Sequence, residues 1–139
     1  MDAASIAEHI TSTFEDVQTS SAYGYEFFFY STERKLPFAT LATSDNDYDR
    51  VSQLDRPGVF RLNIGVSRPT FQSLFGAERA DPSAYDFSAL DTIMPHPDYA
   101  AQSWICVLSP SDATLQRVQQ LLAEAYDIAV RRHSRRAPD

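Results

Sequence analysis

The stretch that decides the fold of this chain is Asp55–Gly76, whose sequence is DRPGVFRLNIGVSRPTFQSLFG. Its Pro57-Gly58 pair is typical of a turn. From residue 59 to residue 66 the side chains alternate between two faces, which predicts a strand with one buried side. One face carries Phe60, Leu62, Ile64 and Val66, and the other carries Arg61 and Asn63.

The signals of a short helix follow this strand at once. Ser67 is a favourable N-cap, because its hydroxyl can accept a hydrogen bond from the first free amides of the helix. Pro69 fits the first turn, where its missing N–H costs nothing, and Gly76 supplies a left-handed exit. The stretch therefore predicts a turn, a strand and a helix in immediate succession.

The segments ahead of this stretch predict a helix and a hairpin. Apolar residues recur at four-residue steps over residues 2–14, which is typical of a helix with one core-facing side. Residues 23–30 are rich in aromatics and predict a central strand. Residues 38–43 are short and alternating, so we expect them to return antiparallel to that strand.

After the stretch, a long irregular segment precedes the last two elements. Residues 77–98 contain three prolines, and we expect only a short helical turn there, at 87–93. Residues 104–108 predict a buried strand. Residues 109–133 begin with a Ser-Pro cap and carry one apolar stripe, which predicts the longest helix.

These elements predict one α+β domain over residues 1–139, with residues 131–139 as a basic, frayed tail. Strands with short connections and separate helices favour an antiparallel sheet of about four strands in a two-layer sandwich. The N- and C-terminal helices would cover one face of this sheet. The opposite face would then stay open to meet a ligand or a partner.

Composition limits the classes of function. The net charge is −7, with 8 Lys/Arg against 18 Asp/Glu in residues 1–130 and four Arg against one Asp in residues 131–139. An acidic body repels phosphate backbones, so nucleic acid is not an expected partner of the folded part. The single cysteine, Cys106, lies in an apolar run and is expected to be buried. We find no secretory signal and no apolar stretch of membrane-spanning length, so the cytoplasm is the expected location.

Five residues are candidates for ligand binding: Arg61, Asn63, His96, Tyr99 and Trp104. Arg61 and Asn63 are polar residues on an otherwise apolar strand, and an arginine there can clamp a carboxylate or phosphate. The alternative is an ion pair with Asp55, Glu26 or another acid. His96, Tyr99 and Trp104 combine a titratable ring with flat apolar area, which suits a small-molecule pocket. The alternative is a structural role, in which the prolines fix a rigid connection and Tyr99 and Trp104 fill space in the core.

Other chemical signals are weak. Residues 45–49 alternate oxygen ligands like the start of a calcium loop, but Arg50 and Arg56 stand where a glycine and a bidentate acid are needed, so a solvated loop is expected. No metal site, cofactor or nucleophile motif is expected. Four arginines form the only basic cluster: Arg131, Arg132, Arg135 and Arg136. Closing the last helix is their simplest role, and nucleic-acid contact is the alternative.

Five segments resemble a family of small bacterial domains of unknown function. They are residues 35–39, 56–66, 95–99, 104–107 and 122–126, and the likeness spans nearly the whole chain. More distantly, the order of elements and the Tyr and Trp ahead of the last strand are similar to the MmcQ/YjbR family. That likeness implies a compact α+β sandwich, DNA binding and a link to antibiotic biosynthesis or resistance, and it brings no catalytic residues.

The sequence thus predicts a non-enzymatic module, monomeric or homodimeric, that binds a small molecule or a protein through the open sheet face and the 77–99 loop. One alternative is weak nucleic-acid binding through the basic tail. The other is a small enzyme in which His96 acts as a general base, which needs a carboxylate or a substrate proton within hydrogen-bond reach.

Overall fold

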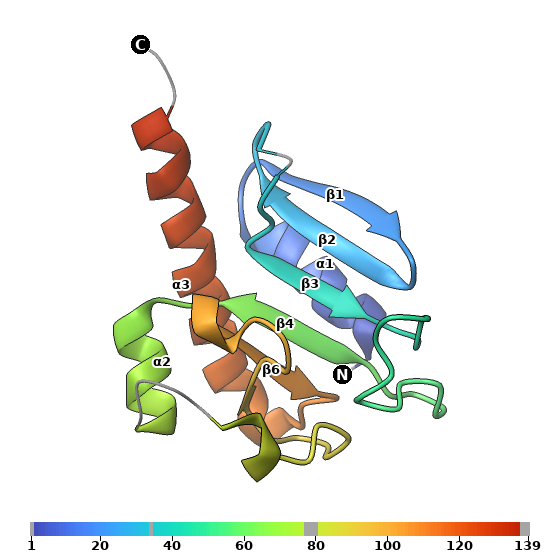
Figure 1. Cartoon of the computed structure of the whole chain (residues 1–139). Helices are drawn as coiled ribbons and strands as arrows, with labels where there is room; N and C mark the ends of the chain where they lie inside the picture. Colours follow the sequence, from blue (N-terminus) through green and yellow to red (C-terminus); the bar gives the residue numbers. More distant parts are fainter. Residues whose placement is uncertain (1, 34, 77–80, 137–139) are drawn as a thin grey trace.

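The computed structural model describes residues 2–33, 35–76 and 81–136, and it has an α+β fold with a six-stranded antiparallel sheet (Figure 1). The strand order is β1-β2-β3-β4-β6-β5. The helices and strands are α1 (Ala3–Thr13), β1 (Val17–Ala22), β2 (Tyr25–Tyr30), β3 (Ala39–Ala42), β4 (Arg61–Gly65), α2 (Arg68–Phe75), β5 (Met94–Pro95), β6 (Trp104–Leu108) and α3 (Asp112–Arg136), with short 3-10 turns at Pro82–Ala84 and Ala100–Gln102.

The sheet has six strands rather than the expected four, because two edge strands carry little sequence signal. β1 is polar and mostly exposed, so no apolar face marks it. It joins β2 through Tyr23 and Gly24, whose φ angles are 56° and 82°, as in the two-residue turns that suit a hairpin. β5 has two residues and includes Pro95, which is tolerated at a sheet edge.

The strand and helix predicted within residues 55–76 are confirmed. The Ser67 hydroxyl accepts a hydrogen bond from the Thr70 amide at 3.2 Å, and Gly76 ends α2 with a φ of 69°. Glu124 of α3 also contacts this helix start, accepting from the Ser67 amide and the Thr70 hydroxyl, each at 2.8 Å. These bonds attach α2 to α3 at the end of β4.

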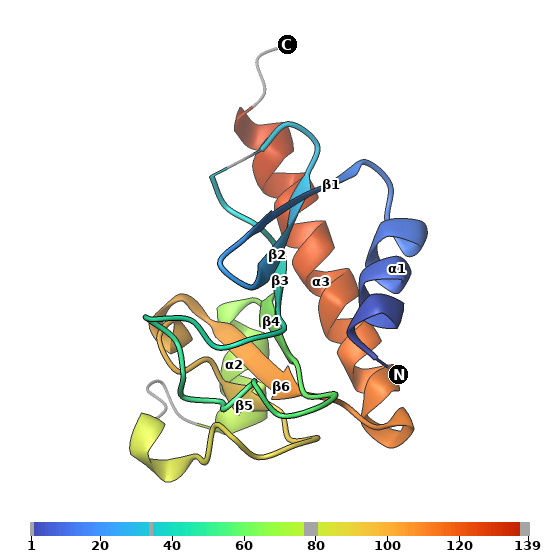
Figure 2. The same ribbon diagram turned by 90° about the vertical axis from the view of Figure 1, so that its right-hand side faces the viewer.

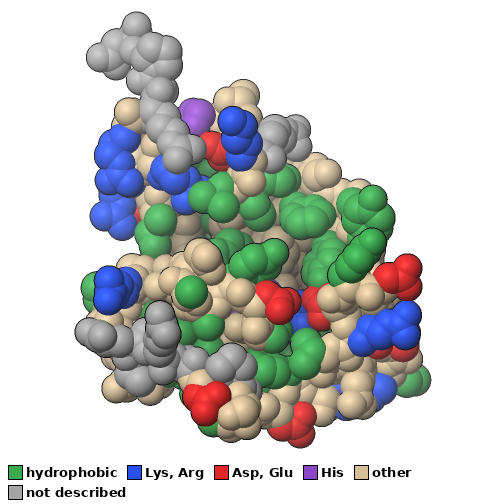
Figure 3. All heavy atoms as spheres, in the orientation of Figure 1, with side chains coloured by type: hydrophobic (Ala, Val, Ile, Leu, Met, Phe, Trp, Pro, Cys, Tyr) green, Lys and Arg blue, Asp and Glu red, His purple; other side chains and the backbone are tan. Residues whose placement is uncertain are grey.

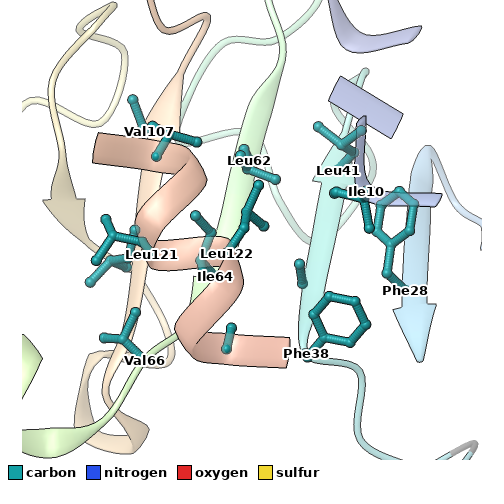
Figure 4. Close-up of a cluster of buried hydrophobic side chains, with 14 of the residues drawn as sticks. Ile10, Phe28, Phe38, Leu41, Leu62, Ile64, Val66, Val107, Leu121 and Leu122 are labelled. Carbon is teal, nitrogen blue, oxygen red and sulfur yellow. The ribbon is translucent and has the colours of Figure 1, made fainter. Parts of the chain in front are cut away.

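One face of the sheet packs against α1 and α3, as predicted (Figure 2). Figure 4 shows Leu121 and Leu122 of α3 over β4 and β6, and Ile10 of α1 beside Phe28 and Leu41. The buried cluster on this side also contains Leu62, Ile64, Ile105, Val107, Val118, Ala125 and Ala129. Residues 131–136 continue α3 rather than forming a frayed tail, and residues 137–139 lie outside the described part.

The opposite face is not open as expected, because the chain's own loops cover part of it. Residues 43–60 and 81–99 cross this side of the sheet (Figure 2). They bury a second apolar cluster of Ala42, Leu54, Phe87, Met94, Cys106 and Leu108. The helical turn expected at 87–93 is not formed beyond a tight turn at 87–88. The rest of this face is the candidate site described below.

Among the described helices, none combines the length and apolar character needed to cross a membrane.

Candidate ligand-binding site

Arg61 is the centre of a polar network on the loop-covered face of the sheet. Its side chain is fully buried, and Nη1 and Nη2 donate to the two carboxylate oxygens of Asp49 at 3.2 and 2.5 Å. Nη1 also donates to Ser52 Oγ at 3.0 Å, and Nε donates to Asn63 Oδ1 at 3.0 Å. The alternative of an internal ion pair is thus the observed one, with Asp49 in place of the acids expected, Asp55 or Glu26.

This pairing keeps the Asp49 carboxylate ionised in a poorly solvated place. Burial alone would raise the pKa of Asp49, but hydrogen bonds from Arg61 and Tyr25 outweigh it and hold the pKa below its usual value. Tyr25 donates its hydroxyl proton to Asp49. Burial, and then the contact with Asp49, raises the pKa of Tyr25 to about 12. Tyr25 is therefore a protonated donor at neutral pH.

Asn63 and Thr40 extend the network across the sheet. They are directly paired on neighbouring strands β4 and β3, so their side chains share one face. Asn63 Nδ2 donates to Thr40 Oγ1 at 2.9 Å. Both residues are buried, and Phe27 follows Thr40 in the same row on β2. The row joins polar and aromatic side chains.

His96 is held in one tautomer by the backbone of its own turn. Its Nδ1 accepts hydrogen bonds from the amides of Asp98 at 3.0 Å and Tyr99 at 3.1 Å. Burial, with a smaller contribution from the Arg61 charge, lowers the pKa of His96 to about 3. The ring is thus neutral near pH 7 and carries its proton on Nε2.

The Trp104 indole packs against β4 because Gly65 has no side chain. The two residues are paired on β6 and β4. A Cβ atom added at Gly65 would lie 2.9 Å from Cε2 of the Trp104 indole. The glycine thus allows the indole to pack on the strand backbone next to Asn63.

These side chains surround a cavity of about 920 Å³ on the loop-covered face. Figure 3 shows a hollow in this face with hydrophobic side chains around it. The aromatic lining comes from Tyr23, Tyr25, Phe27, Phe38, Tyr48, Tyr99 and Trp104. The polar lining comes from Thr40, Asn46, Asp49, Asn63, His96, Asp98, Gln102 and Arg132, and Ala125 and Ile128 of α3 complete the end beyond β3 and β4.

Four of the five candidate residues line this cavity: Asn63, His96, Tyr99 and Trp104. Arg61 does not, because its buried guanidinium lies behind Asp49 and Asn63. Sequence reasoning missed Tyr25 and Asp49. Tyr25 has a usable signal, since alternation along β2 and the pairing of β2, β3 and β4 place it on the same face as Asn63, whereas Asp49 sits in a loop with no periodicity.

Of the four arginines of the basic cluster, Arg132 lines the cavity. Arg131 pairs with Asp127 at 3.1 Å, and Arg132 Nη2 donates to the Leu36 carbonyl at 3.4 Å. Arg135 is exposed. Arg136 is the last residue of α3. Among the residues that the structure describes, no group of three His, Cys, Asp or Glu side chains is placed to hold a metal ion. Cys106 is buried, as predicted, and burial raises the pKa of its thiol to about 12.

Comparison with known proteins gives one result. No curated protein and no solved structure matches the chain, so these comparisons do not show the MmcQ/YjbR likeness. A family model described as a family of unknown function, DUF6194, matches residues 1–138. This span is essentially the whole sequence, and the protein therefore belongs to the DUF6194 family.

Proposed function

We propose that this protein is a non-enzymatic module that binds a small molecule in the cavity between β2, β3, β4 and the loops that follow β3 and α2. The observation that carries this proposal is the cavity itself, whose aromatic walls surround a few fixed polar groups. Its volume of about 920 Å³ lies within the usual range of about 300–1,000 Å³ for ligand pockets.

The polar groups support binding rather than catalysis. His96 is the candidate general base, but its Nδ1 already accepts two backbone hydrogen bonds and its low pKa keeps the ring neutral. Its free position, Nε2, carries a proton. Such a ring donates a hydrogen bond and is poorly suited to remove a proton from a substrate.

Nucleic-acid binding is less well supported. Two of the four arginines of the basic cluster already contact groups of this chain, Arg131 with Asp127 and Arg132 with the Leu36 carbonyl. The links of the MmcQ/YjbR family with DNA and with antibiotic biosynthesis or resistance stay predictions from the sequence likeness alone. A protein partner remains the competing occupant of the same face.

Ligand capture tests the proposal. Protein purified under native conditions would be denatured, and released small molecules would be identified by mass spectrometry and then titrated back. We expect binding with a change in the fluorescence of Trp104, the single tryptophan of the chain. Tyr99→Ala removes an exposed wall of the cavity and should weaken binding about tenfold. Leu90→Ala, which truncates a comparably exposed apolar side chain outside the cavity lining, should not.

Two results would contradict the proposal. One is a set of released and screened compounds none of which binds the wild-type protein. The other is equal binding by the Tyr99→Ala and wild-type proteins, which would place the ligand elsewhere on the molecule.

A further inference from the structure

The hydrogen-bond pattern of the cavity identifies the chemistry of its ligand, provided that the proposed binding function holds. Inside the polar network the acceptors are already used. Asn63 Oδ1 accepts from Arg61, Thr40 Oγ1 accepts from Asn63, and the Asp49 carboxylate accepts from Arg61 and Tyr25. Each of these acceptors therefore already takes a hydrogen bond from within the chain.

Two ring N–H groups are the clearest donors of the cavity lining. His96 Nε2 and Trp104 Nε1 both lack a hydrogen-bond partner among the described residues. Within the same part of the chain no buried side-chain nitrogen or oxygen is without a partner, so these two nitrogens are accessible from the cavity rather than enclosed. A ligand that displaced water from them would have to supply acceptors, because an unpaired N–H costs about 1–3 kcal/mol.

The two donors come from opposite positions on neighbouring strands. The His96 amide donates to the Trp104 carbonyl at 2.9 Å, which extends the β5–β6 pairing by one residue. Side chains that are directly opposite on neighbouring antiparallel strands share a face and lie about 5 Å apart at Cβ. The His96 and Trp104 side chains therefore leave opposite positions on one face of the sheet, and both line the cavity. The Thr40 hydroxyl accepts from Asn63 and keeps its own proton to donate, which adds a third donor to this side of the cavity.

The charges of the polar network do not favour a simple anion site. The Arg61 guanidinium is neutralised by Asp49, and His96 is uncharged. Asp98 lines the cavity beside His96. A ligand carboxylate next to the two rings would therefore meet two acids and the already paired Arg61, while the other cation of the lining, Arg132, donates to the Leu36 carbonyl at 3.4 Å. An uncharged acceptor avoids this repulsion.

We propose that the cavity selects an uncharged, flat, apolar ligand with a carbonyl-type acceptor, and that this acceptor takes hydrogen bonds from His96 Nε2–H and Trp104 Nε1–H. The flat shape follows from the walls, where Tyr25, Phe27 and the Trp104 indole supply aromatic surface. Aromatic pairs favour stacked or edge-to-face contact with planar rings.

Three naphthalene probes of similar size test this chemistry: 2-acetylnaphthalene, 2-isopropylnaphthalene and 2-naphthoate. The first carries a neutral carbonyl, the second has no acceptor, and the third carries an anion. Each would be titrated into the wild-type protein labelled with ¹⁵N. Because the chain has one tryptophan, its indole N–H gives one identifiable signal. We expect the ketone to bind about tenfold more tightly than either other probe, and only the ketone to shift the indole proton downfield.

A matched variant removes one donor and keeps the ring. Trp104→Phe leaves an aromatic side chain over Gly65 without an N–H, so the ratio of ketone to hydrocarbon affinity, measured by ligand-observed NMR, should fall about threefold or more. Leu90→Ala truncates an exposed side chain outside the cavity lining, and it should leave that ratio unchanged.

The outcomes separate the inference from the proposed function. If the ketone and the hydrocarbon bind equally and the indole signal shifts with neither, the cavity is a binding site. The proposal that the ligand needs a carbonyl-type acceptor is then wrong. If 2-naphthoate binds most tightly, the charge argument is wrong. If none of the three probes binds, the inference fails, and the ligand-capture experiment still decides the binding function on its own.

Discussion

At the scale of single residues, the Arg61–Asp49 pair has the largest consequences. An arginine with no exposed surface is tolerated only when its charge and N–H groups are matched, because desolvation of an ion is costly. Here the match comes from a carboxylate, a hydroxyl and an amide oxygen. The pair fixes the loop that carries Asp49 against β4, so that Asp49 lines the cavity while Arg61 does not.

Removing one partner of this pair should be strongly destabilising. Arg61→Met leaves Asp49 buried without its cation, and the expected loss in the free energy of unfolding is about 3–5 kcal/mol, measured by urea denaturation. Arg50→Met is the matched control, because Arg50 pairs with Asp47 of the same loop at 3.2 Å with both side chains largely exposed. That substitution should cost less than about 1 kcal/mol.

The double variant Arg61→Met/Asp49→Leu tests the reason for the effect. It removes both charges, so it should be more stable than Arg61→Met alone. Similar losses for Arg61→Met and Arg50→Met would show that burial of the pair has no energetic consequence.

At the scale of elements, the pairing of β4 with β6 determines the shape of the cavity. Alternation along residues 59–66 was enough to predict which side chains of β4 face the helices. It was not enough to predict that Trp104 would cross over Gly65, because that contact depends on the register between two strands 39 residues apart. For the same reason β1 and β5 were missed: an exposed polar edge and a two-residue strand have no apolar period to detect.

Gly65→Ala should therefore move the indole. The added methyl group would lie 2.9 Å from the ring, and overpacking of this kind costs about 1–3 kcal/mol. We expect a shift in the emission of Trp104 together with the loss in stability. Gly58→Ala is the control, because Gly58 has a φ of 73° and open space around its Cβ position. It should lose about 1 kcal/mol to backbone strain and leave the emission unchanged.

An unaltered Trp104 spectrum in Gly65→Ala would show that the indole does not depend on the missing side chain. Equal spectral shifts in both glycine variants would point to a general loosening of the fold instead.

At the scale of the whole molecule, the sheet uses its two faces differently. The helix face is a continuous apolar core. Its residues were predictable because apolar residues recur with the helical period in the helices and with the strand period in the strands. The other face combines a small apolar cluster, a buried ion pair and a cavity, and all three depend on loops 43–60 and 81–99. Loop paths have no periodic signal, so the sequence predicted four lining residues but not the acid that neutralises Arg61.

Burial of His96 on the loop-covered face also makes the free energy of unfolding depend on pH, between about pH 3 and pH 6.5. His96 has a pKa of about 3 in the folded chain, against about 6.5 for an unperturbed histidine. Between these values the unfolded chain binds the extra proton, so stability rises with pH and falls as the solution is acidified from about pH 6.5. The slope from this one proton is at most about 1.4 kcal/mol per pH unit. Asp49 acts lower, because its depressed pKa removes stability only as pH falls below about 4.

Urea denaturation of the wild type and of His96→Asn at several values between pH 4 and pH 7 separates these contributions. Asparagine does not titrate, and its side-chain oxygen can accept the Asp98 and Tyr99 amides as His96 Nδ1 does. We expect the variant to have a flatter profile between pH 6 and pH 4 and to keep the acid-induced loss below about pH 4. Parallel profiles above pH 4 would contradict this prediction. They would mean that His96 gains its proton in the folded chain as readily as in the unfolded chain, although the ring is buried and its Nδ1 accepts two backbone hydrogen bonds.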